Sequence, residues 1–311
     1  MSTKSGCQLS RSEHGFILVS VILSVTLLLS AATAFAWFAR VQVKRVETRI
    51  FIVQARSAAE IVCSLAAKKI AEDKNGYDST AEPLYSSISQ MKTDIGDFTV
   101  TYKIEPLDDK IPVRGLFLPD GVTMRSEYEA GWTRIWDYLK KSELAAIVAD
   151  FMDSDEKQKL GGSERENSIN RLVSDLSELK LIPEIEDGVL WGTEKIPGGL
   201  GRYLGIYGKE KINVNVARPE VIAILDSRID LSQARSIVTA RIISPIKSLD
   251  DLKKLPAFPD AVVTKLANVL GFESTYFRVV MKVKNNAGKE RNYRIILERA
   301  GSSCKISRWE E

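Results

Sequence analysis

An uncharged apolar run near the N-terminus constrains the fold most strongly. Residues 16–39 are 24 consecutive amino acids without a charge. A helix of that length spans ~36 Å, which is sufficient to cross a bilayer with some tilt. A secretory signal peptide has a shorter apolar core that ends at a small-residue cleavage site. Here the obvious small-residue break is Gly15, before the run, so the sequence predicts a retained transmembrane helix.

The helical pattern continues beyond this run. Apolar residues from Val43 to Leu65 keep a spacing of three and four, with charged residues between them, and no Pro or Gly occurs between residues 16 and 73. This pattern is typical of an amphipathic helix. We therefore expect a single helix of over fifty residues, with one half in lipid and the other half against a folded domain.

Composition excludes several classes of function. The chain has 311 residues with 44 basic and 41 acidic side chains, a balance that gives no electrostatic footprint for nucleic acid as a main partner. Its single histidine, His14, adjoins the apolar run, so the folded body has no residue for His-based zinc sites or for Ser–His catalysis. Cys63 and Cys304 are expected to be separate small apolar side chains, and their pairing stays open.

The rest of the chain predicts a small sheet interrupted by helices. Residues 98–105 alternate apolar and polar side chains, as in a half-buried strand, and residues 276–284 and 289–299 flank the turn sequence NNAG. Between these strands, residues 134–152 and 169–182 have helical apolar spacing. The predicted class is therefore α+β.

The N-terminus resembles that of type IV pilins and pseudopilins, with a short basic leader, Gly15, Phe16, and a long apolar helix with an amphipathic continuation. In that family a prepilin peptidase cuts after the glycine and methylates the new N-terminal residue. The resemblance implies cleavage between Gly15 and Phe16 and N-methylation of Phe16. Most members have Glu at the fifth mature position, where this chain has Ser20. A carboxylate in hydrocarbon costs a few kcal/mol without a cationic partner, and a subunit placed first has no neighbour to supply one.

The member that typically lacks this Glu is the K-type minor pseudopilin of type II secretion. Several segments resemble that group: KINVNVARPEVIAIL (211–225), ARSIVTARIISPIKSLDDL (234–252), ESTYFRV (273–279), ADFMDSD…GGSE (149–164) and SEL (177–179). The resemblance implies a pilin-like roll, in which the long helix packs on an antiparallel sheet interrupted by a large helical insertion. The implied boundaries are a leader (1–15), a transmembrane helix (16–39), a pilin-like helix with first strands (40–105), the insertion (106–273) and C-terminal strands (274–311).

Residues 211–272 also resemble paired helix-hairpin-helix or SAM-like units. Helices are expected near 218–227, 232–242, 248–254 and 260–270, with Ser232, Ser248 and Asp260 as N-caps. DNA-binding units of this kind use Gly-rich hairpins that let phosphate approach the backbone. Both hairpins here, LDSRIDLSQ and LPAFPDA, lack glycine. A membrane-anchored DNA-uptake protein is therefore the alternative rather than the main interpretation.

An acidic segment is a candidate calcium site. Hard cations require several carboxylate oxygens on a loop that wraps them, and calcium has been associated with K-type members. We expect Asp153, Asp155 and Glu164 as ligands before Asp150, which belongs to the preceding helix; the spacing fits no EF-hand. An exposed acidic loop without a metal is the alternative.

The sequence as a whole predicts a non-enzymatic assembly protein without a required cofactor. Its expected partners are I-, J- and H-type minor pseudopilins, through the N-terminal helix and the pilin-like domain, together with prepilin peptidase and inner-membrane lipid, but no nucleic acid. The resemblance implies a single-pass inner-membrane protein with a periplasmic body. The positive-inside rule alone would place the body in the cytoplasm, because Arg40, Lys44, Arg45 and Arg49 follow the span. A minor pilin of another type IV filament is a further alternative.

Overall fold

The computed structural model describes residues 11–86, 90–164 and 168–310. The chain divides into two compact units, Met1–Ser57 and Ala58–Glu311, and each is described by itself. Helix α1 (Arg11–Glu72) is 62 residues long, begins in the first unit and ends in the second. The expectation of one helix from the apolar run to about residue 72 is confirmed.

The described part of the first unit is entirely α1. Its apolar side chains are exposed, with Phe16 at 75% and Leu23 at 68%, and by length and composition Gly15–Glu72 is a helix that could cross a membrane. The hydroxyl groups in this segment donate hydrogen bonds to carbonyl oxygens three or four residues earlier, at Ser20, Ser24, Thr26, Ser30 and Thr33. These polar groups therefore need no partner outside the helix, as a lipid environment requires.

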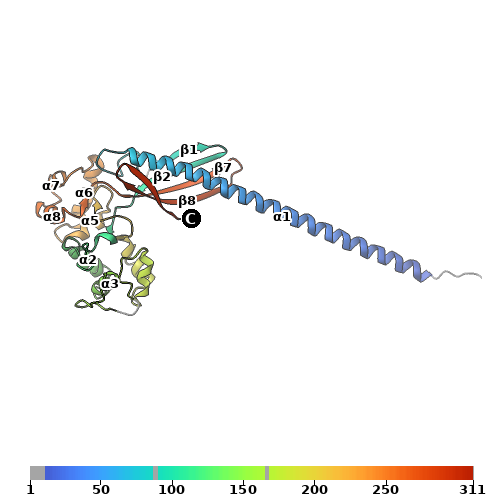
Figure 1. Ribbon diagram of the computed structural model, residues 1–311, viewed down its shortest axis with the longest axis horizontal. Coiled ribbons are helices and arrows are strands. Elements are labelled where there is room, and N and C mark those ends of the chain that lie inside the picture. Colours follow the sequence, from blue (N-terminus) through green and yellow to red (C-terminus); the bar gives the residue numbers. More distant parts are fainter. Residues whose placement is uncertain (1–10, 87–89, 165–167, 311) are drawn as a thin grey trace, which may run out of the picture. The chain divides into compact units, whose positions relative to one another are not determined.

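The second unit is built on a five-stranded antiparallel sheet in the order β1-β2-β7-β8-β9 (Figure 1). Its strands are β1 (Met91–Ile95), β2 (Phe98–Pro106), β7 (Tyr276–Asn285), β8 (Glu290–Ala300) and β9 (Ser303–Glu310). The expected strand at 98–105 and the hairpin around NNAG are confirmed as β2, β7 and β8. The edge strands β1 and β9 were not predicted, because their sequences MKTDI and SCKISRWE alternate only weakly.

One face of this sheet is covered by the part of α1 that lies in the second unit. From it the helix buries Ala59, Val62, Ala66 and Ile70, and the small alanines let helix and strands approach closely. Lys69 Nζ lies 3.5 Å from the Tyr102 hydroxyl of β2. Burial of each large aliphatic side chain stabilises the fold by about 1.5–3 kcal/mol.

Cys63 of α1 is buried and Cys304 of β9 is half-buried, and both are free thiols. Cys304 pairs with Arg299 in the β8–β9 ladder. Burial, together with the nearby Cys304, raises the pKa of Cys63 to about 12, and burial raises the pKa of Cys304 to about 11. Both groups are therefore thiols rather than thiolates at neutral pH.

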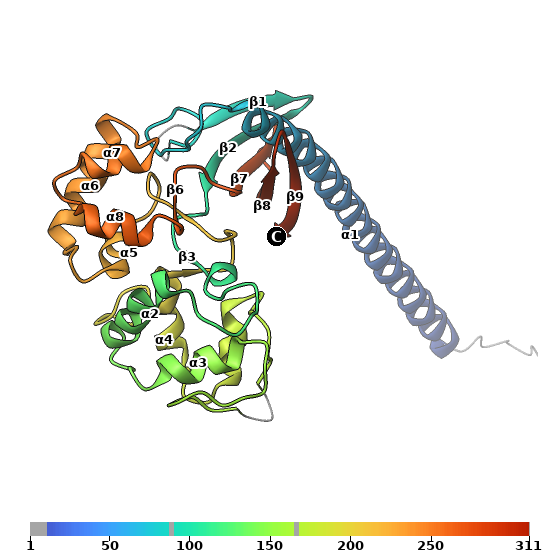
Figure 2. The same ribbon diagram turned by 60° about the vertical axis from the view of Figure 1, so that its left-hand side comes forward.

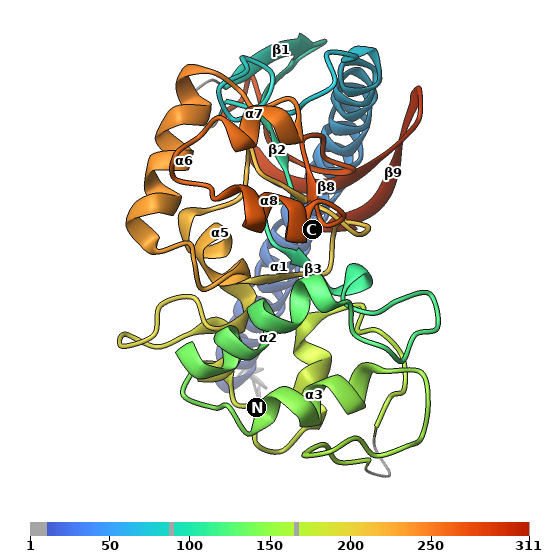
Figure 3. The same ribbon diagram turned by 90° about the vertical axis from the view of Figure 1, so that its left-hand side faces the viewer.

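The segment between β2 and β7 contains the expected helices, although they account for less than half of its residues. Figures 2 and 3 show α5–α8 gathered in one group and α2–α4 in another. Its α-helices are α2 (Ser126–Tyr138), α3 (Leu144–Met152), α4 (Asp187–Trp191), α5 (Pro219–Leu225), α6 (Leu231–Ile243), α7 (Leu249–Lys253) and α8 (Asp260–Leu266). Short 3-10 turns lie at Val113–Gly115, Leu176–Leu181 and Leu200–Arg202.

This insertion has its own apolar core, with buried residues from Ile111 to Leu270. Trp132 and Trp136 lie four residues apart on α2, both are buried, and their rings meet edge to face at 5.6 Å. Both tryptophans therefore belong to the core of the insertion. Tyr138 is 43% exposed and contacts the ring of Tyr203 instead.

Two predicted helices are shorter than their patterns suggested. The pattern over 134–152 is interrupted between α2 and α3, where Lys140 has a φ of 56°, a conformation that ends a helix. The pattern over 169–182 gives only the 3-10 turn Leu176–Leu181, which begins at a capping box of Asp175 and Glu178.

The helix starts in the C-terminal half of the insertion differ in part from expectation. Ser248 caps α7 and accepts a hydrogen bond from the Asp251 amide, as predicted. Helix α6 begins two residues earlier than Ser232 implied, because Asp230 is its N-cap and forms a capping box with Gln233. The N-cap of α8 is Pro259 rather than Asp260, which is the first helical residue.

Two short parallel pairs lie at the base of the insertion. Strand β3 (Ile111–Pro112) pairs with β4 (Leu204–Gly205), and β5 (Ile212–Asn213) pairs with β6 (Leu270–Gly271). Each pair joins segments that are far apart in the sequence, so together they connect the start, middle and end of the insertion.

Candidate functional site

The predicted processing site lies at the beginning of α1. Gly15 and Phe16 are helical and exposed, whereas residues 1–10 of the predicted leader lie outside the described part of the chain. The Ser20 hydroxyl donates to the Phe16 carbonyl oxygen at 2.9 Å. At position 20, the predicted fifth mature position, this chain therefore has a polar group whose hydrogen bond is made within its own helix, where a carboxylate would need an external cation.

The predicted calcium ligands meet at the C-terminal end of α3. One carboxylate oxygen from each of Asp153, Asp155 and Glu164 lies within 4.8 Å of the others. Asp153 directly follows the helix and is fully buried. The expected order of ligands is consistent with the placement of Asp150, which lies inside α3 and accepts a hydrogen bond from the Lys159 amide at 3.1 Å.

The oxygens of this cluster suit a hard cation. Asp153 Oδ1, Asp150 Oδ1 and Glu164 Oε1 are buried and have no hydrogen-bond partner, which is costly for carboxylates unless a cation is bound. Burial raises the pKa of Asp153 and that of Glu164, and the neighbouring carboxylates add to both shifts. The Lys159 ammonium contacts Asp153 Oδ2 and is the cluster's internal counterion.

Glycine is required beside this cluster. A Cβ on Gly162 would lie 2.0 Å from Asp150 Oδ2, and Gly161 has a φ of +79°. The backbone therefore passes close to the acidic side chains, and the GG pair lets the loop turn back toward α3.

The Asn-x-Asn motif, noted in the sequence only for its resemblance, connects separate parts of the second unit. Asn213 Nδ2 donates to the Asp78 carbonyl and to the Ser274 hydroxyl, both at 2.9 Å. Asn215 donates to the Ile246 carbonyl at 2.7 Å and accepts from the Ile246 amide at 2.8 Å. Both asparagines are fully buried. Their role is to fix the insertion to the strand connections and to hold the α6–α7 loop.

The cations of the helix-hairpin-helix region are largely engaged within the protein. Arg228 and Lys265 both pair with the carboxylate of Asp226, at 2.8 and 3.0 Å. Arg241 is buried and donates to the carbonyl oxygens of Val214 and Ala217. These contacts occupy groups that a phosphate backbone would need.

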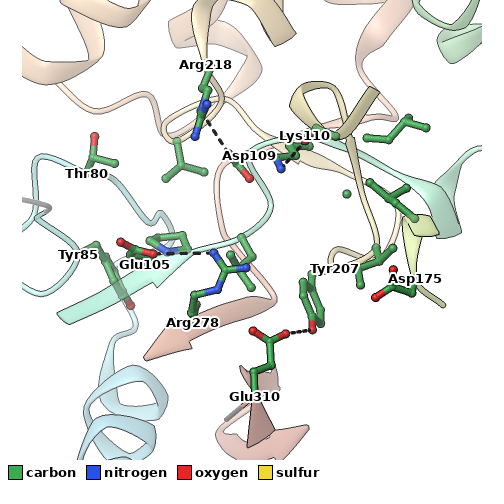
Figure 4. A pocket seen from close by; sticks show the side chains of 18 of the residues that line it. Thr80, Tyr85, Glu105, Asp109, Lys110, Asp175, Tyr207, Arg218, Arg278 and Glu310 are labelled. Atoms are coloured by element: carbon green, nitrogen blue, oxygen red, sulfur yellow. Dashed lines mark hydrogen bonds and ion pairs between the residues drawn. The ribbon is translucent and has the colours of Figure 1, made fainter. Parts of the chain in front are cut away.

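A cavity of about 440 Å³ lies between the sheet and the insertion (Figure 4). Arg218 and Arg278 extend into it, with the nearest carboxylate oxygens at 3.9 Å, from Asp109, and 4.0 Å, from Glu105. The Tyr207 hydroxyl donates to Glu310 at 2.7 Å. Burial raises the pKa of Asp109 and lowers that of Lys110, whose ammonium donates to the Gly201 carbonyl at 2.7 Å. The sequence did not indicate this cavity, because its lining comes from many separate segments.

Comparison with known proteins relates this arrangement to one family. Residues 212–273 match the family model described as type II secretion system (T2SS), protein K. The matched segment contains the Asn-x-Asn motif and helices α5–α8. No curated protein matches the chain.

The fold is similar to a chain in the crystal structure of the GspK–GspI–GspJ complex from the type 2 secretion system of enterotoxigenic Escherichia coli. The TM-score is 0.65 at 15% sequence identity, and the match covers 86% of this chain and 99% of that chain. The fold class expected from the sequence, a long N-terminal helix and an antiparallel sheet with inserted helices, is thereby confirmed. Residues 212–273 are thus similar to protein K of the type II secretion system, and the chain shares its fold with a chain of the GspK–GspI–GspJ complex.

Proposed function

We propose that the protein is a minor pseudopilin that lies at the tip of the type II secretion pseudopilus. There it initiates and caps assembly with other minor pseudopilins. The tip position is supported by the presence of Ser20 in place of Glu. The Ser20 hydroxyl donates a hydrogen bond to the Phe16 carbonyl oxygen at 2.9 Å and needs no other partner. A subunit with Glu at this position would need a cation from a subunit ahead of it. A first subunit has no such neighbour and is more stable without the acid.

The proposal includes the processing and location of the chain. Prepilin peptidase removes the leader between Gly15 and Phe16 and methylates Phe16, and the apolar part of α1 then holds the protein in the inner membrane. The body lies in the periplasm, and the helix packs with those of I-, J- and H-type partners. The matching structure is a complex that contains GspI and GspJ, which supports the I-type and J-type partners. The role is structural, not enzymatic.

Co-expression with a prepilin peptidase tests the processing step. N-terminal sequencing and intact mass are expected to give a chain that begins at Phe16 with one added methyl group. A Gly15→Leu variant, in which the small residue before the cut is replaced, is expected to keep its leader. If the wild-type chain keeps its leader in the presence of an active peptidase, the proposed function is wrong.

The DNA-binding alternative has a separate test. The mature protein in detergent is passed over immobilised double-stranded DNA at 0.15 M salt, beside a helix-hairpin-helix protein known to bind DNA. We expect it to elute without retention. Retention that a salt gradient removes would favour the DNA-uptake alternative.

We further propose that Asp153, Asp155 and Glu164 hold a calcium ion that orders the segment after α3. The ion would neutralise the buried carboxylate oxygens that have no hydrogen-bond partner. Millimolar calcium is expected to raise the unfolding temperature of the wild type but not that of Asp153→Asn. An Asp250→Asn variant, on the exposed side of α7, serves as the control. No shift in the wild type would reject the site.

A further inference from the structure

The face of the sheet opposite α1 is strongly basic. Along each strand, side chains alternate between the face that α1 covers and the opposite, outer face. The register shows which residues of neighbouring strands lie together on the outer face. The cations there are Lys92, Lys103, Arg278, Lys282, Lys284, Arg294, Lys305 and Arg308. The carboxylates in the same rows are Asp94, Glu105, Glu290, Glu298 and Glu310. Cations therefore exceed carboxylates on a surface of a chain that is otherwise close to neutral. Of the charged residues on this face, Glu105, Arg278 and Glu310 line the cavity between the sheet and the insertion.

The two middle rows of this face have a regular charge pattern. Across the strands they are Lys92–Thr101–Lys282–Asn292 and Lys103–Val280–Arg294–Glu310. Within each row the cations are separated by one uncharged residue, the second row ends with Glu310 opposite Arg294, and the two rows are offset by one strand. Because strands lie ~4.8 Å apart and alternate residues ~6.8 Å apart, neighbouring cations are spaced by about 8 Å in a zigzag. We call Lys92, Lys103, Lys282 and Arg294 the basic zigzag.

The fold itself makes limited use of these charges. Lys282 pairs with Glu290 at 2.8 Å, and Lys103 contacts Glu105. Within the described ranges, Lys92 and Arg294 make no ion pair. Like charges about 8 Å apart still repel each other at a Debye length of ~8–10 Å, and this repulsion opposes the stability that the two ion pairs contribute.

A shallow hollow of about 190 Å³ lies within the zigzag. Its lining includes the Gln90, Thr101 and Asn292 side chains beside Lys103 and Lys282. Amide and hydroxyl donors next to ammonium groups suit carboxylate oxygens. Neither middle row presents an aromatic side chain on which a nucleobase could stack, which favours an acidic protein segment over a nucleic acid.

We propose that the outer face of this sheet is a docking surface for an acidic, extended segment of a partner protein. Alternate side chains of an extended segment repeat every ~6.8 Å, close to the spacing of the zigzag. The carboxylates lie over the four cations, and the segment's middle lies over the hollow. This inference goes beyond the proposed function, because it depends on neither the tip position nor the processing of the leader.

The test measures binding of a fluorescein-labelled peptide of ten glutamates to the full chain in detergent. Fluorescence anisotropy is expected to show binding that weakens as salt increases. The variant Lys92→Gln/Lys103→Gln/Arg294→Gln is expected to bind at least tenfold more weakly. The control Lys195→Gln/Lys253→Gln/Lys254→Gln removes the same charge from the insertion and is expected to bind like the wild type.

Two further measurements keep the result interpretable. The conservative variant Lys92→Arg/Lys103→Arg is expected to retain affinity, and circular dichroism checks that the triple variant is folded. Equal weakening in the triple variant and its control would overturn the proposal, because it would show attraction by net charge alone. Tighter binding of a ten-nucleotide single-stranded DNA than of the peptide, lost in the triple variant, would also overturn it in favour of a nucleic-acid surface.

Discussion

The pH dependence of stability tests the role of Asp108, which lies where the chain passes from the sheet into the insertion. Its carboxylate accepts hydrogen bonds from the Thr275 and Tyr276 amides, at 2.9 and 3.0 Å, where the chain returns to the sheet. The side chain is only 3% exposed. Burial raises its pKa from 3.8 to about 7, the two amides oppose this shift, and the charges of Asp78 and Asp109 add to it.

The sign follows from proton binding. Between pH 3.8 and 7 the folded protein retains a proton on Asp108 that the unfolded chain has released. The free energy of unfolding therefore falls as the pH rises through this window and is independent of Asp108 above it. At about 1.4 kcal/mol per pKa unit, the loss between pH 5 and pH 7.5 is roughly 2.5 kcal/mol.

An Asp108→Asn variant keeps an oxygen that accepts both amide hydrogen bonds but cannot ionise. Guanidinium unfolding of the full chain in detergent, followed by tryptophan fluorescence, gives the free energy of unfolding at each pH. We expect the variant to lack about 2.5 kcal/mol of the wild-type pH dependence, whereas the exposed control Asp97→Asn should retain it. Identical slopes for wild type and Asp108→Asn would refute the reasoning, whatever other carboxylates contribute.

Three further predictions concern the packing and polar contacts of the second unit. Trp136→Ala should lower the free energy of unfolding by about 3–5 kcal/mol, since it empties a fully buried site, and equilibrium denaturation would show a loss below 1 kcal/mol if the site were not packed. Asn215→Ala leaves both backbone groups of Ile246 unpaired and should cost about 1–3 kcal/mol, with hydrogen exchange accelerated at Ile246; an unchanged exchange rate would contradict this role. Because burial raises the pKa of Cys63 to about 12, its alkylation by iodoacetamide at pH 8 should be much slower than that of a free cysteine peptide, and equal rates would show that the thiol is accessible.

A separate prediction applies at acidic pH, where Asp226 is the relevant group. Its hydrogen bonds and ion pairs with Arg228 and Lys265 hold the pKa of the carboxyl well below its usual range. The contribution to stability is therefore present above the ordinary pKa of Asp and is lost as the pH falls through the lowered one. Asp226→Asn should cost about 1–3 kcal/mol at pH 7, and the difference from wild type should shrink as the pH falls below 4. If the difference in the free energy of unfolding between the two proteins stayed constant with pH, this role of Asp226 would be contradicted.

Periodicity predicted the elements that bury a continuous face. The α1 pattern, the β2 alternation and the NNAG hairpin each depend on a local rule that tertiary contacts reinforce. Strands β1 and β9 were missed because an edge strand is paired on one side only and tolerates polar residues. The segment around 169–182 has helical spacing but is held by a capping box over a single 3-10 turn.

The candidate site was predictable where ligands are close in sequence. Asp153, Asp155 and Glu164 lie in one short segment, so its carboxylates, together with its resemblance to K-type members, indicated the cluster that the fold assembles. The basic zigzag could not be predicted in this way, because its members come from four strands and the register was unknown. The same holds for Asp108, whose partners at Thr275 and Tyr276 are separated from it by the whole insertion.

The pairing of β2 with β7 has a consequence for how such a chain can be rebuilt. Pro106 lies opposite Phe277 in the ladder, and the Leu107 amide donates to the Tyr276 carbonyl at 2.9 Å. The polypeptide thus leaves and re-enters the sheet at neighbouring points, about 5 Å apart. A turn of a few residues would span that gap, so a shortened chain in which such a turn replaces the insertion would join β2 and β7 as an uninterrupted hairpin.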